Sequence, residues 1–354
     1  MGPALAIDIG GTKMAAGLVA ADGALLRRAE TPTPDDGPES IFAALARVSD
    51  AVRRGDEVVC GVGTGGPMTT DGEEVSPLNI PAWRRFPLRR RLAESTGLAT
   101  FVDNDAKALA LGEGWVGAAV GVADFLAMVV STGVGGGVVL GGRLLEGAGG
   151  NAGHIGHVIV VPGGRRCGCG AHGCLEAEAS GSGIRRATGR PAVEASPEVV
   201  VHAGTVVGRA VASVANLLDL RLALVAGSVA LGFGSPFFAA AQAELDRCAR
   251  LDFSAGARIQ PAGLGDRGPL VGAGAVGWRG LGVDVLAGAG GRPAAPPTLL
   301  ACRTPRFPSG SAGQKGEREM GDGVWAAVVG RRRARPVTPP RPVVDGGAPG
   351  SPSG

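Results

Sequence analysis

The sequence contains no tyrosine, and aromatic residues of all kinds make up only 4% of it. It also has no uncharged apolar run as long as a membrane-spanning helix, and no repeat of 20–50 residues stands out. The first residues, MGPALAIDIGG, have no basic stretch before their apolar part, which is unlike a secretory signal peptide. We therefore expect a cytoplasmic protein that has no membrane partner and whose cysteines are reduced.

The charge is unevenly distributed along the 354 residues. Residues 281–354 hold ten Lys or Arg and five Asp or Glu, a net of +5, so residues 1–280 carry a net of −2. This nearly neutral body gives no reason to expect a nucleic-acid partner. Residues 281–354 also contain 11 prolines and 14 glycines and lack apolar periodicity. We predict that they form a disordered tail, because such a segment buries too little surface to offset its ordering entropy.

Apolar runs of strand length alternate with stretches of helical periodicity, which predicts an α/β protein. The pair Asp22-Gly23 lies between two apolar runs and is a typical hairpin turn. Strands are predicted over residues 4–9, 99–105, 124–131, 221–228 and 257–262, together with a strand that ends in a glycine-rich loop over 57–68 and a hairpin over 137–145. Helices are predicted over residues 38–54, 87–97, 107–119 and 268–280, and over much of 180–249.

The order of these elements shows a weak internal symmetry. A strand, a hairpin and then alternating helices and strands begin near Leu5 and again near Phe125. With 45% hydrophobic residues, the chain is long enough for two domains with sizeable cores. We expect a smaller half (1–116) and a larger half (117–280) that face each other across a cleft, and the final helix could pack back on the first half.

Three cysteines, Cys167, Cys169 and Cys174, lie within eight residues, and His157 lies ten residues before the first of them. Three thiolates and one imidazole are a complete tetrahedral set for a structural Zn²⁺, with no position left for water. Ordinary buried cysteines or disulfides are the alternatives. The close spacing and the expected reducing compartment favour the metal.

Two glycine-rich turns follow predicted strands. The first combines an acid, two glycines, a hydroxyl and a base: Asp8, Gly10, Gly11, Thr12 and Lys13. Glycines let backbone N–H groups approach phosphate oxygens, and Asp8 could hold Mg²⁺ through water. The second turn, STGVGGG (131–137), has the same composition. A strand-to-hairpin turn also uses Gly-Gly for geometry alone, but a nucleotide held between two lobes needs a cradle from each.

Asp103, Asn104 and Asp105 end a predicted strand and open a predicted helix. Asp and Asn are good helix N-caps, which accounts for one of the three. A carboxylate at this place could also accept the proton of a substrate hydroxyl as it attacks phosphorus. Polar residues that could hydrogen-bond a polyhydroxylated ligand are Asn79, Asn104, His154, His157 and Glu176.

In this order the motifs resemble the ROK group of bacterial sugar kinases, within the actin/hexokinase/Hsp70-like superfamily. The resemblance covers roughly residues 4–280 and rests on IDIGGTK, GPM with NIPAW, FVDNDAKALALGE, STGVGGGVV and VAGSV. Its most specific part is H-x9-C-x-C-G-x2-G-C-x-E, from His157 to Glu176. The resemblance implies a two-lobed actin-like ATPase (ribonuclease H-like) fold with a zinc-stapled loop, and members are commonly homodimers.

The resemblance also implies a role for each matching residue. Asp105 would be the general base that accepts the proton of the sugar hydroxyl, usually at C6. The sugar would be bound by Asn79, Asn104, His157 and Glu176. The phosphates of ATP and Mg²⁺ would be held by Asp8, Gly10, Gly11, Thr12, Lys13, Thr132 and Gly133, and Gly227 would lie near the adenosine. A structural Zn²⁺ bound by His157, Cys167, Cys169 and Cys174 would fix the sugar-binding loop.

The sequence departs from the family at one sugar contact, because His154 stands in AGHIGH where the family usually has glutamate. An imidazole changes the hydrogen bonding to the sugar ring. We predict ATP-dependent phosphorylation of a hexose, with glucose to glucose 6-phosphate first. The alternatives are an N-acetylglucosamine or N-acetylmannosamine kinase, polyphosphate as the donor, or a sugar-sensing protein without catalysis, against which the retained Asp105 argues. We expect no DNA-binding helix-turn-helix before Gly10.

Overall fold

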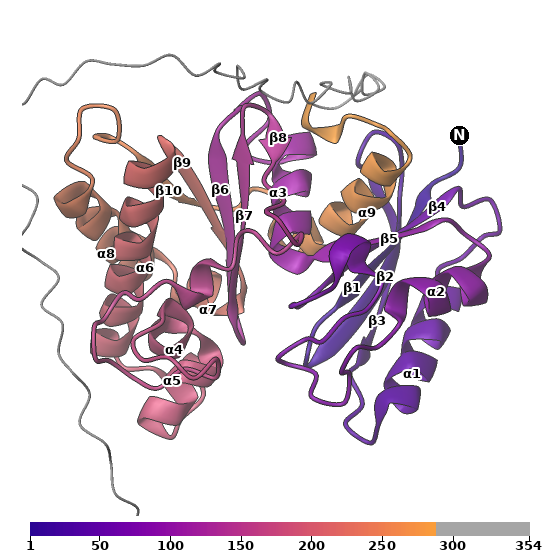
Figure 1. Ribbon diagram of the computed structural model, residues 1–354, viewed down its shortest axis with the longest axis horizontal. Helices are drawn as coiled ribbons and strands as arrows, with labels where there is room; N and C mark the ends of the chain where they lie inside the picture. Colours follow the sequence, from indigo (N-terminus) through magenta and orange to yellow (C-terminus); the bar gives the residue numbers. More distant parts are fainter. Residues whose placement is uncertain (288–354) are drawn as a thin grey trace, which may run out of the picture. The chain divides into compact units, whose positions relative to one another are not determined.

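Two five-stranded sheets, with helices between and outside them, make up residues 1–287, the part of the chain that this computed structural model describes. The sheets lie on either side of the helices α3 and α9 (Figure 1). The first sheet has the order β3-β2-β1-β4-β5 and contains β1 (Ala4–Ile9), β2 (Lys13–Val19), β3 (Leu25–Pro32), β4 (Val59–Thr64) and β5 (Thr100–Asn104). The second has the order β10-β9-β6-β7-β8 and contains β6 (Phe125–Val130), β7 (Val134–Leu140), β8 (Arg143–Leu144), β9 (Leu222–Ala226) and β10 (Arg258–Pro261).

In the first sheet, β1 pairs antiparallel with β2 and parallel with β4, and β4 pairs parallel with β5. The predicted turn at Asp22-Gly23 is confirmed between β2 and β3, where Gly23 has a φ of 84°. The parallel register places Asp8 opposite Gly63, and Gly63 opposite Asp103. The carboxyl ends of β1 and β5 therefore place acidic residues at one edge of the sheet, with Gly63 of β4 between them.

The second sheet repeats this path. β6 pairs antiparallel with β7 and parallel with β9, and β9 pairs parallel with β10. These are the relations that β1 has with β2 and β4, and β4 with β5. The internal symmetry predicted from the sequence is thus confirmed as one topology used twice.

The helices α3 (Asp105–Val116) and α9 (Gly268–Gly280) lie between the two sheets and are buried along most of their length. Their small residues allow close approach, since a Cβ added to Gly112 would lie 3.1 Å from the Gly272 Cα. In the same way α9 packs directly on β4, where a Cβ on Gly277 would lie 3.2 Å from the Gly61 Cα. The last long helix therefore covers a strand of the first sheet.

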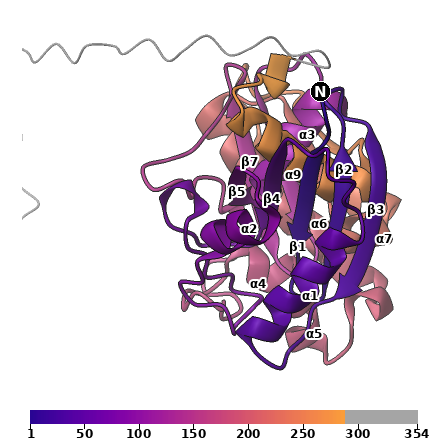
Figure 2. The same ribbon diagram turned by 90° about the vertical axis from the view of Figure 1, so that its right-hand side faces the viewer.

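The outer faces of the sheets are covered by other helices. α1 (Pro38–Asp50) and α2 (Leu88–Thr96) cover the first sheet (Figure 2), and α6 (Pro197–Leu218) and α8 (Ser235–Cys248) pair over the second. Within residues 1–287, α6 alone is long and apolar enough to span a membrane, but 56% of its apolar window is buried in the protein, so its apolar face belongs to the core. The remaining helices are α4 (Leu175–Ala179), α5 (Gly181–Thr188) and α7 (Ser228–Phe233). The 3-10 turns are η1 (Thr70–Gly72), η2 (Ile155–His157), η3 (Ala192–Glu194), η4 (Gly265–Arg267) and η5 (Val285–Ala287).

The folded chain continues beyond the predicted start of the tail at residue 281, so that boundary is wrong by seven residues. Residues 281–287 pack against α3 through η5, with Val285 buried and Leu286 against Gly114. The reason is their composition, because the apolar residues of LGVDVLA still find a place in the core between the sheets. The rest of the predicted tail, 288–354, lies outside the described residues.

Candidate active site

Two carboxylates lie together at the carboxyl edge of the first sheet. Asp8 is the next-to-last residue of β1 and Asp105 begins α3, and between them Gly63 carries no side chain. A Cβ on Gly63 would lie 3.8 Å from Asp8 Oδ1 and 3.6 Å from the Asp105 Cα. Both aspartates are half-buried. The missing side chain at Gly63 leaves a space that both acids border.

Burial gives the two carboxyl groups unusual acidities. It raises the pKa of Asp8 to about 7, with a further increase from the charge of Asp105 and a decrease from Lys13. It also raises the pKa of Asp105, against the hydrogen bonds from the Ala106 N–H and the Asn104 amide. A raised carboxyl pKa in a polar site is typical of groups that transfer protons or bind cations.

The three side chains of the segment Asp103-Asn104-Asp105 have different partners. Asn104 is the N-cap of α3, since its Oδ1 accepts a hydrogen bond from the Ala106 N–H at 3.0 Å. Asp103 is buried and forms an ion pair with Lys107 at 2.8 Å. The capping that the sequence predicted for one of the three thus falls on Asn104, and Asp105 is left as the carboxylate that faces Asp8.

The first glycine turn joins β1 to β2 and is closed by a hydrogen bond from the Gly10 N–H to the Lys13 carbonyl, 3.0 Å. Thr12 and Lys13 are exposed, and Lys13 forms a solvent-exposed ion pair with Glu30 at 3.2 Å. Exposed pairs of this kind are weak, so the ammonium group is free to exchange its partner. The turn therefore presents backbone N–H groups, a hydroxyl and a cation to solvent.

The second glycine turn joins β6 to β7 and is closed more tightly, by a hydrogen bond from the Ser131 N–H to the Gly133 carbonyl at 2.9 Å. Thr132 is exposed at its tip. The Ser131 hydroxyl lies 3.0 Å from that of Ser228, which directly follows Gly227. Gly227 has a φ of 101° and presses against the backbone of β6, where a side chain would not fit. Thr132, Gly133 and Gly227, predicted nucleotide residues, therefore lie around neighbouring strand ends of the second sheet.

Gly135 on β7 connects the second turn to the acidic edge of the first sheet. A Cβ at this residue would lie 3.8 Å from Asp105 Oδ1 and 4.0 Å from Asn104 Oδ1. The strand that carries the second glycine turn thus borders the start of α3.

Three of the predicted sugar-binding side chains gather around a glycine pair after β4. A Cβ on Gly65 would lie 2.9 Å from Asn79 Oδ1. A Cβ on Gly66 would lie 3.2 Å from His154 Cε1 and 3.7 Å from Asn104 Nδ2. Asn79 also lies against the first glycine turn, with its carbonyl oxygen 2.6 Å from a Cβ on Gly11. The sequence-predicted residues are therefore brought together although they come from three separate segments.

The other two, His157 and Glu176, border the same region from the second half of the chain. The rings of His154 and His157 lie 6.2 Å apart and nearly perpendicular. Glu176 Oε2 accepts a hydrogen bond from the Val134 N–H at 3.1 Å, which joins this acid to the second glycine turn. Burial, with the neighbouring His157, lowers the pKa of His154 although the charge of Glu176 opposes it. His154 is therefore a neutral imidazole at pH 7, with one donor and one acceptor.

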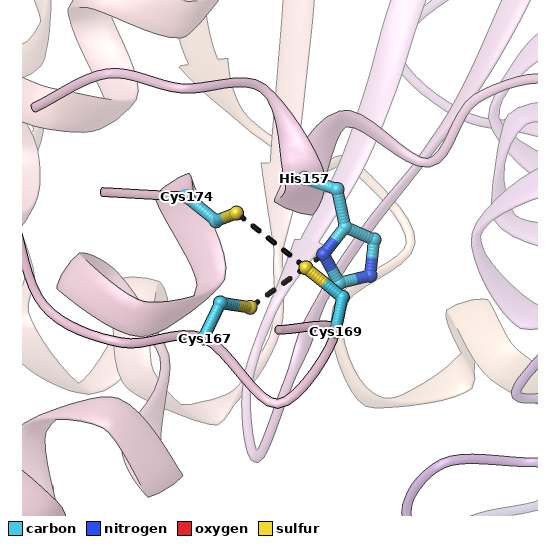
Figure 3. A group of neighbouring side chains, drawn as sticks. All are labelled: His157, Cys167, Cys169 and Cys174. Atoms are coloured by element: carbon cyan, nitrogen blue, oxygen red, sulfur yellow. Dashed lines mark hydrogen bonds between the residues drawn. The ribbon is translucent and has the colours of Figure 1, made fainter. Parts of the chain in front are cut away.

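His157, Cys167, Cys169 and Cys174 point toward a common centre (Figure 3), with their four ligand atoms within 4.8 Å of one another. The Cys169 and Cys174 sulfurs are 3.7 Å apart, as are the Cys167 sulfur and His157 Nδ1. Bonds of about 2.3 Å to a tetrahedral Zn²⁺ place two sulfurs about 3.8 Å apart. A disulfide is about 2 Å long, so these cysteines are not bonded to each other. The predicted donor set fits a zinc ion.

The cysteine cluster joins the segments that carry the polar residues. His157 ends η2, and η2 begins directly after His154. Cys174 precedes α4, which carries Glu176. Burial, with the neighbouring thiols, raises the pKa of Cys174 to about 12, so a thiolate there needs a cation to be stable. A metal at this place would hold η2 and α4 in one arrangement.

Sequence reasoning missed a charged network behind the site. Lys107 lies on α3 with 1% of its surface exposed and contacts Asp103 and Glu146. Arg279, at the end of α9, also pairs with Glu146, at 2.6 Å. The available signal was a lysine in the otherwise apolar run AKALAL, where a helix buried on all sides leaves no solvent for an ammonium group.

Comparison with known proteins adds independent information. The model of the ROK family matches residues 4–277. An N-acetylmannosamine kinase of Escherichia fergusonii is 40% identical over 248 residues, which cover 65% of this chain and 84% of the relative. Among solved structures, a ROK family glucokinase from Streptomyces griseus in complex with glucose and AMPPNP is 30% identical, with a TM-score of 0.71 and coverage of 78% of this chain and all of that one. The ROK hexokinase from Thermus thermophilus is 35% identical, with a TM-score of 0.65 and coverage of 79% and 99%.

Proposed function

The chain belongs to the ROK family and has its actin-like fold, and on this premise we propose that it transfers a phosphoryl group from ATP to the C6 hydroxyl of a hexose-type sugar. The observation that carries the proposal is the half-buried Asp105 at the start of α3, separated from Asp8 by a residue without a side chain. Acids on both sides of that space are suited to a hydroxyl nucleophile on one side and a metal-bound phosphate on the other.

Asp105 is the proposed general base. Burial raises the pKa of Asp105, which makes its carboxylate a stronger base toward the attacking hydroxyl. The hydrogen bond from the Ala106 N–H at 2.8 Å stabilises the ionised form. The helix N-terminus also favours the carboxylate through its dipole. Asp105 would take the proton as the sugar oxygen attacks, and positioning supplies most of the remaining rate enhancement.

The nucleotide would bind between the two glycine turns, in contact with Gly10, Gly11, Thr12, Lys13, Thr132 and Gly133 and with the adenosine near Gly227. Their exposed backbone N–H groups and the Lys13 ammonium suit phosphate oxygens. Asp8 would hold Mg²⁺ through water, and the bound ion would neutralise the charge that develops on the phosphates. A cation there would also relieve the cost of keeping the buried Asp8 ionised.

For the sugar we propose N-acetylmannosamine ahead of glucose. The 40% identical relatives are named N-acetylmannosamine kinases, and the chain has His154, next to Gly66, at a predicted sugar contact. A neutral imidazole offers a donor and an acceptor, which match the carbonyl and the N–H of an acetamido group, whereas a carboxylate only accepts. Glucose is the second candidate, because the 30% identical glucokinase was crystallised with it.

A structural zinc would complete the site without taking part in the transfer. His157 turns Nδ1 toward Cys167, which leaves Nε2 for a sugar hydroxyl. The four donors leave no open coordination position, so the ion's proposed task is to fix η2 and α4. We further propose that the active form is a homodimer, and light scattering of the purified protein would measure this. We also propose that the protein is cytoplasmic.

The proposal is tested with purified, zinc-loaded protein in a coupled ADP-release assay. The panel contains N-acetylmannosamine, N-acetylglucosamine, glucose and mannose, with ATP or polyphosphate as the donor. We expect N-acetylmannosamine with ATP to give the highest kcat/KM. Sugar binding without any phosphorylation would instead support the sugar-sensing alternative, and no binding of any sugar would exclude both.

A further inference from the structure

The loop of residues 145–153 connects β8 to η2 and ends next to His154. Two backbone hydrogen bonds hold its ends, from Leu145 N–H to the Val138 carbonyl at 2.8 Å and from Ala152 N–H to the Glu146 carbonyl at 2.9 Å. Its middle is fixed by contacts with other parts of the chain. These contacts lie outside the sugar- and phosphate-binding residues described above.

The first contact comes from Lys107, inside the body of the protein. Its Nζ donates to Glu146 and to the Gly150 carbonyl at 3.1 Å, and it pairs with Asp103 at 2.8 Å. Arg279 approaches the other oxygen of Glu146 at 2.6 Å. Burial disfavours the Glu146 carboxylate, but the hydrogen bonds from Lys107 and Arg279 outweigh it and hold its pKa below the usual range. Two acids and two bases thus balance each other's charge.

The second contact reaches from the loop to the first half of the chain. The Asn151 side chain accepts a hydrogen bond from the Met68 N–H at 3.2 Å and donates one to the Met68 carbonyl at 3.0 Å. One amide group therefore satisfies both polar atoms of one backbone residue. Met68 lies two residues after Gly66, against which His154 packs.

Lys107 and Asn151 hold the loop on two sides, and His154 directly follows it. We propose that Lys107 and Asn151 are positioning residues for His154: they hold the 145–153 loop so that the imidazole stays against Gly66 and Asn104, and thereby set the KM for the sugar. This inference rests on the proposed kinase function. It assigns neither residue to proton transfer or to phosphate binding.

The geometry explains why the effect falls on the sugar and not on ATP. Met68 and Gly66 follow β4, beside the polar residues around the sugar position, while Lys13 and Thr132 project from the glycine turns. A misplacement of about 1 Å in a positioning group is enough to cost a large factor in an enzymatic reaction. Loss of the Asn151 contact should therefore raise the sugar KM and leave the ATP KM unchanged.

The central experiment compares Asn151→Ala with Gln242→Ala. Gln242 makes the same kind of contact in α8, donating to the Ala257 carbonyl at 3.0 Å and accepting from the Ile259 N–H at 2.8 Å. We expect Asn151→Ala to raise the sugar KM about tenfold, or about 1.4 kcal/mol, with less than a twofold change in the KM for ATP. Gln242→Ala should change neither constant. Asn151→Asp keeps the acceptor but sets a carboxylate oxygen against the Met68 and Gly149 carbonyl oxygens, so its sugar KM should rise at least as much as that of alanine.

Lys107→Met tests the other side of the loop. It leaves the buried Asp103 and the partly exposed Glu146 with Arg279 as their partner, so we expect a larger increase in the sugar KM and faster amide hydrogen exchange in peptides covering 145–153. If this variant does not fold, the Asn151 series still decides the question.

The outcomes separate the inference from the function on which it rests. A wild-type protein that phosphorylates no sugar overturns the proposed function. An active wild type whose Asn151→Ala variant keeps its sugar KM, or loses kcat and both KM values equally, overturns the positioning role. Increased exchange in the 145–153 peptides of Asn151→Ala, but not of Gln242→Ala, would support it at the level of structure.

Discussion

Replacement of Asp8 by asparagine should stabilise the protein while it removes the proposed Mg²⁺ ligand. Burial and the neighbouring Asp105 raise the pKa of Asp8 from 3.8 to about 7. Between these values the folded protein holds a proton that the unfolded chain has released. The free energy of unfolding therefore falls as the pH rises from about 4 to about 7, and it stays low above that range.

The size of the effect follows from this pKa difference. About three pKa units correspond to about 4 kcal/mol at pH 8. Asp8 is only partly buried and Lys13 offsets part of the cost, so we expect roughly half of this value to be recovered by the neutral, nearly isosteric asparagine. A gain of about 2 kcal/mol at pH 8 should shrink toward zero as the pH approaches 4.

Urea unfolding of the ligand-free protein between pH 5 and pH 8 measures this directly. Asp35→Asn, at an exposed aspartate, is the matched control and should follow the wild-type curve. Addition of Mg²⁺ with a non-hydrolysable ATP analogue should stabilise wild type more than Asp8→Asn. Two results would refute this assignment of Asp8: an Asp8→Asn variant that is less stable than wild type at pH 8, or a stability difference that does not depend on pH. Either would mean that the ionised Asp8 carboxylate does not destabilise the ligand-free protein.

Three further predictions concern catalysis, the metal and the core. Asp105→Asn should lower kcat by about 10²–10⁴-fold in the coupled assay while the sugar Kd by calorimetry changes little; an unchanged kcat would remove Asp105 as the base. Cys169→Ser should lose bound zinc after dialysis, measured by atomic absorption, and show a higher sugar KM. Cys248→Ser, outside the cluster, should keep the zinc content and the sugar KM of wild type. Equal zinc in the two variants would contradict the proposed site. Val285→Ala should cost roughly 1–3 kcal/mol in urea unfolding and Val193→Ala, 91% exposed, close to nothing; equal values would mean that η5 does not contribute to the core.

The order of elements could be predicted from the sequence because each strand and helix is indicated by its own residues and their immediate neighbours. The run ALAIDI before a glycine turn and the turn at Asp22-Gly23 are read from neighbouring residues alone, and β1 and its hairpin follow them. The cysteine cluster was predictable for a similar reason, since three of its four donors lie within eight residues. In both cases the physical constraint acts over a short stretch of chain.

What could not be predicted depends on contacts between distant segments. Asn151 and Met68 are 83 residues apart, and nothing in either neighbourhood indicates their pairing. Lys107 in a helix could have been a solvated side chain, because only the packing of α3 between two sheets makes it buried. The proline and glycine content of residues 281–354 predicts an end of the fold at residue 280, although Val285 still reaches the core.

The position of α9 has a consequence for how the protein is made. This helix is encoded after both sheets, yet it packs on β1 and β4 near the start of the chain. During synthesis, β1 and β4 leave the ribosome more than 200 residues before α9 is made, since β4 ends at Thr64 and α9 begins at Gly268. That half therefore cannot finish folding on the ribosome ahead of the second, as N-terminal domains usually do. We expect the newly made chain to expose part of an apolar sheet face until its last long helix has been synthesised.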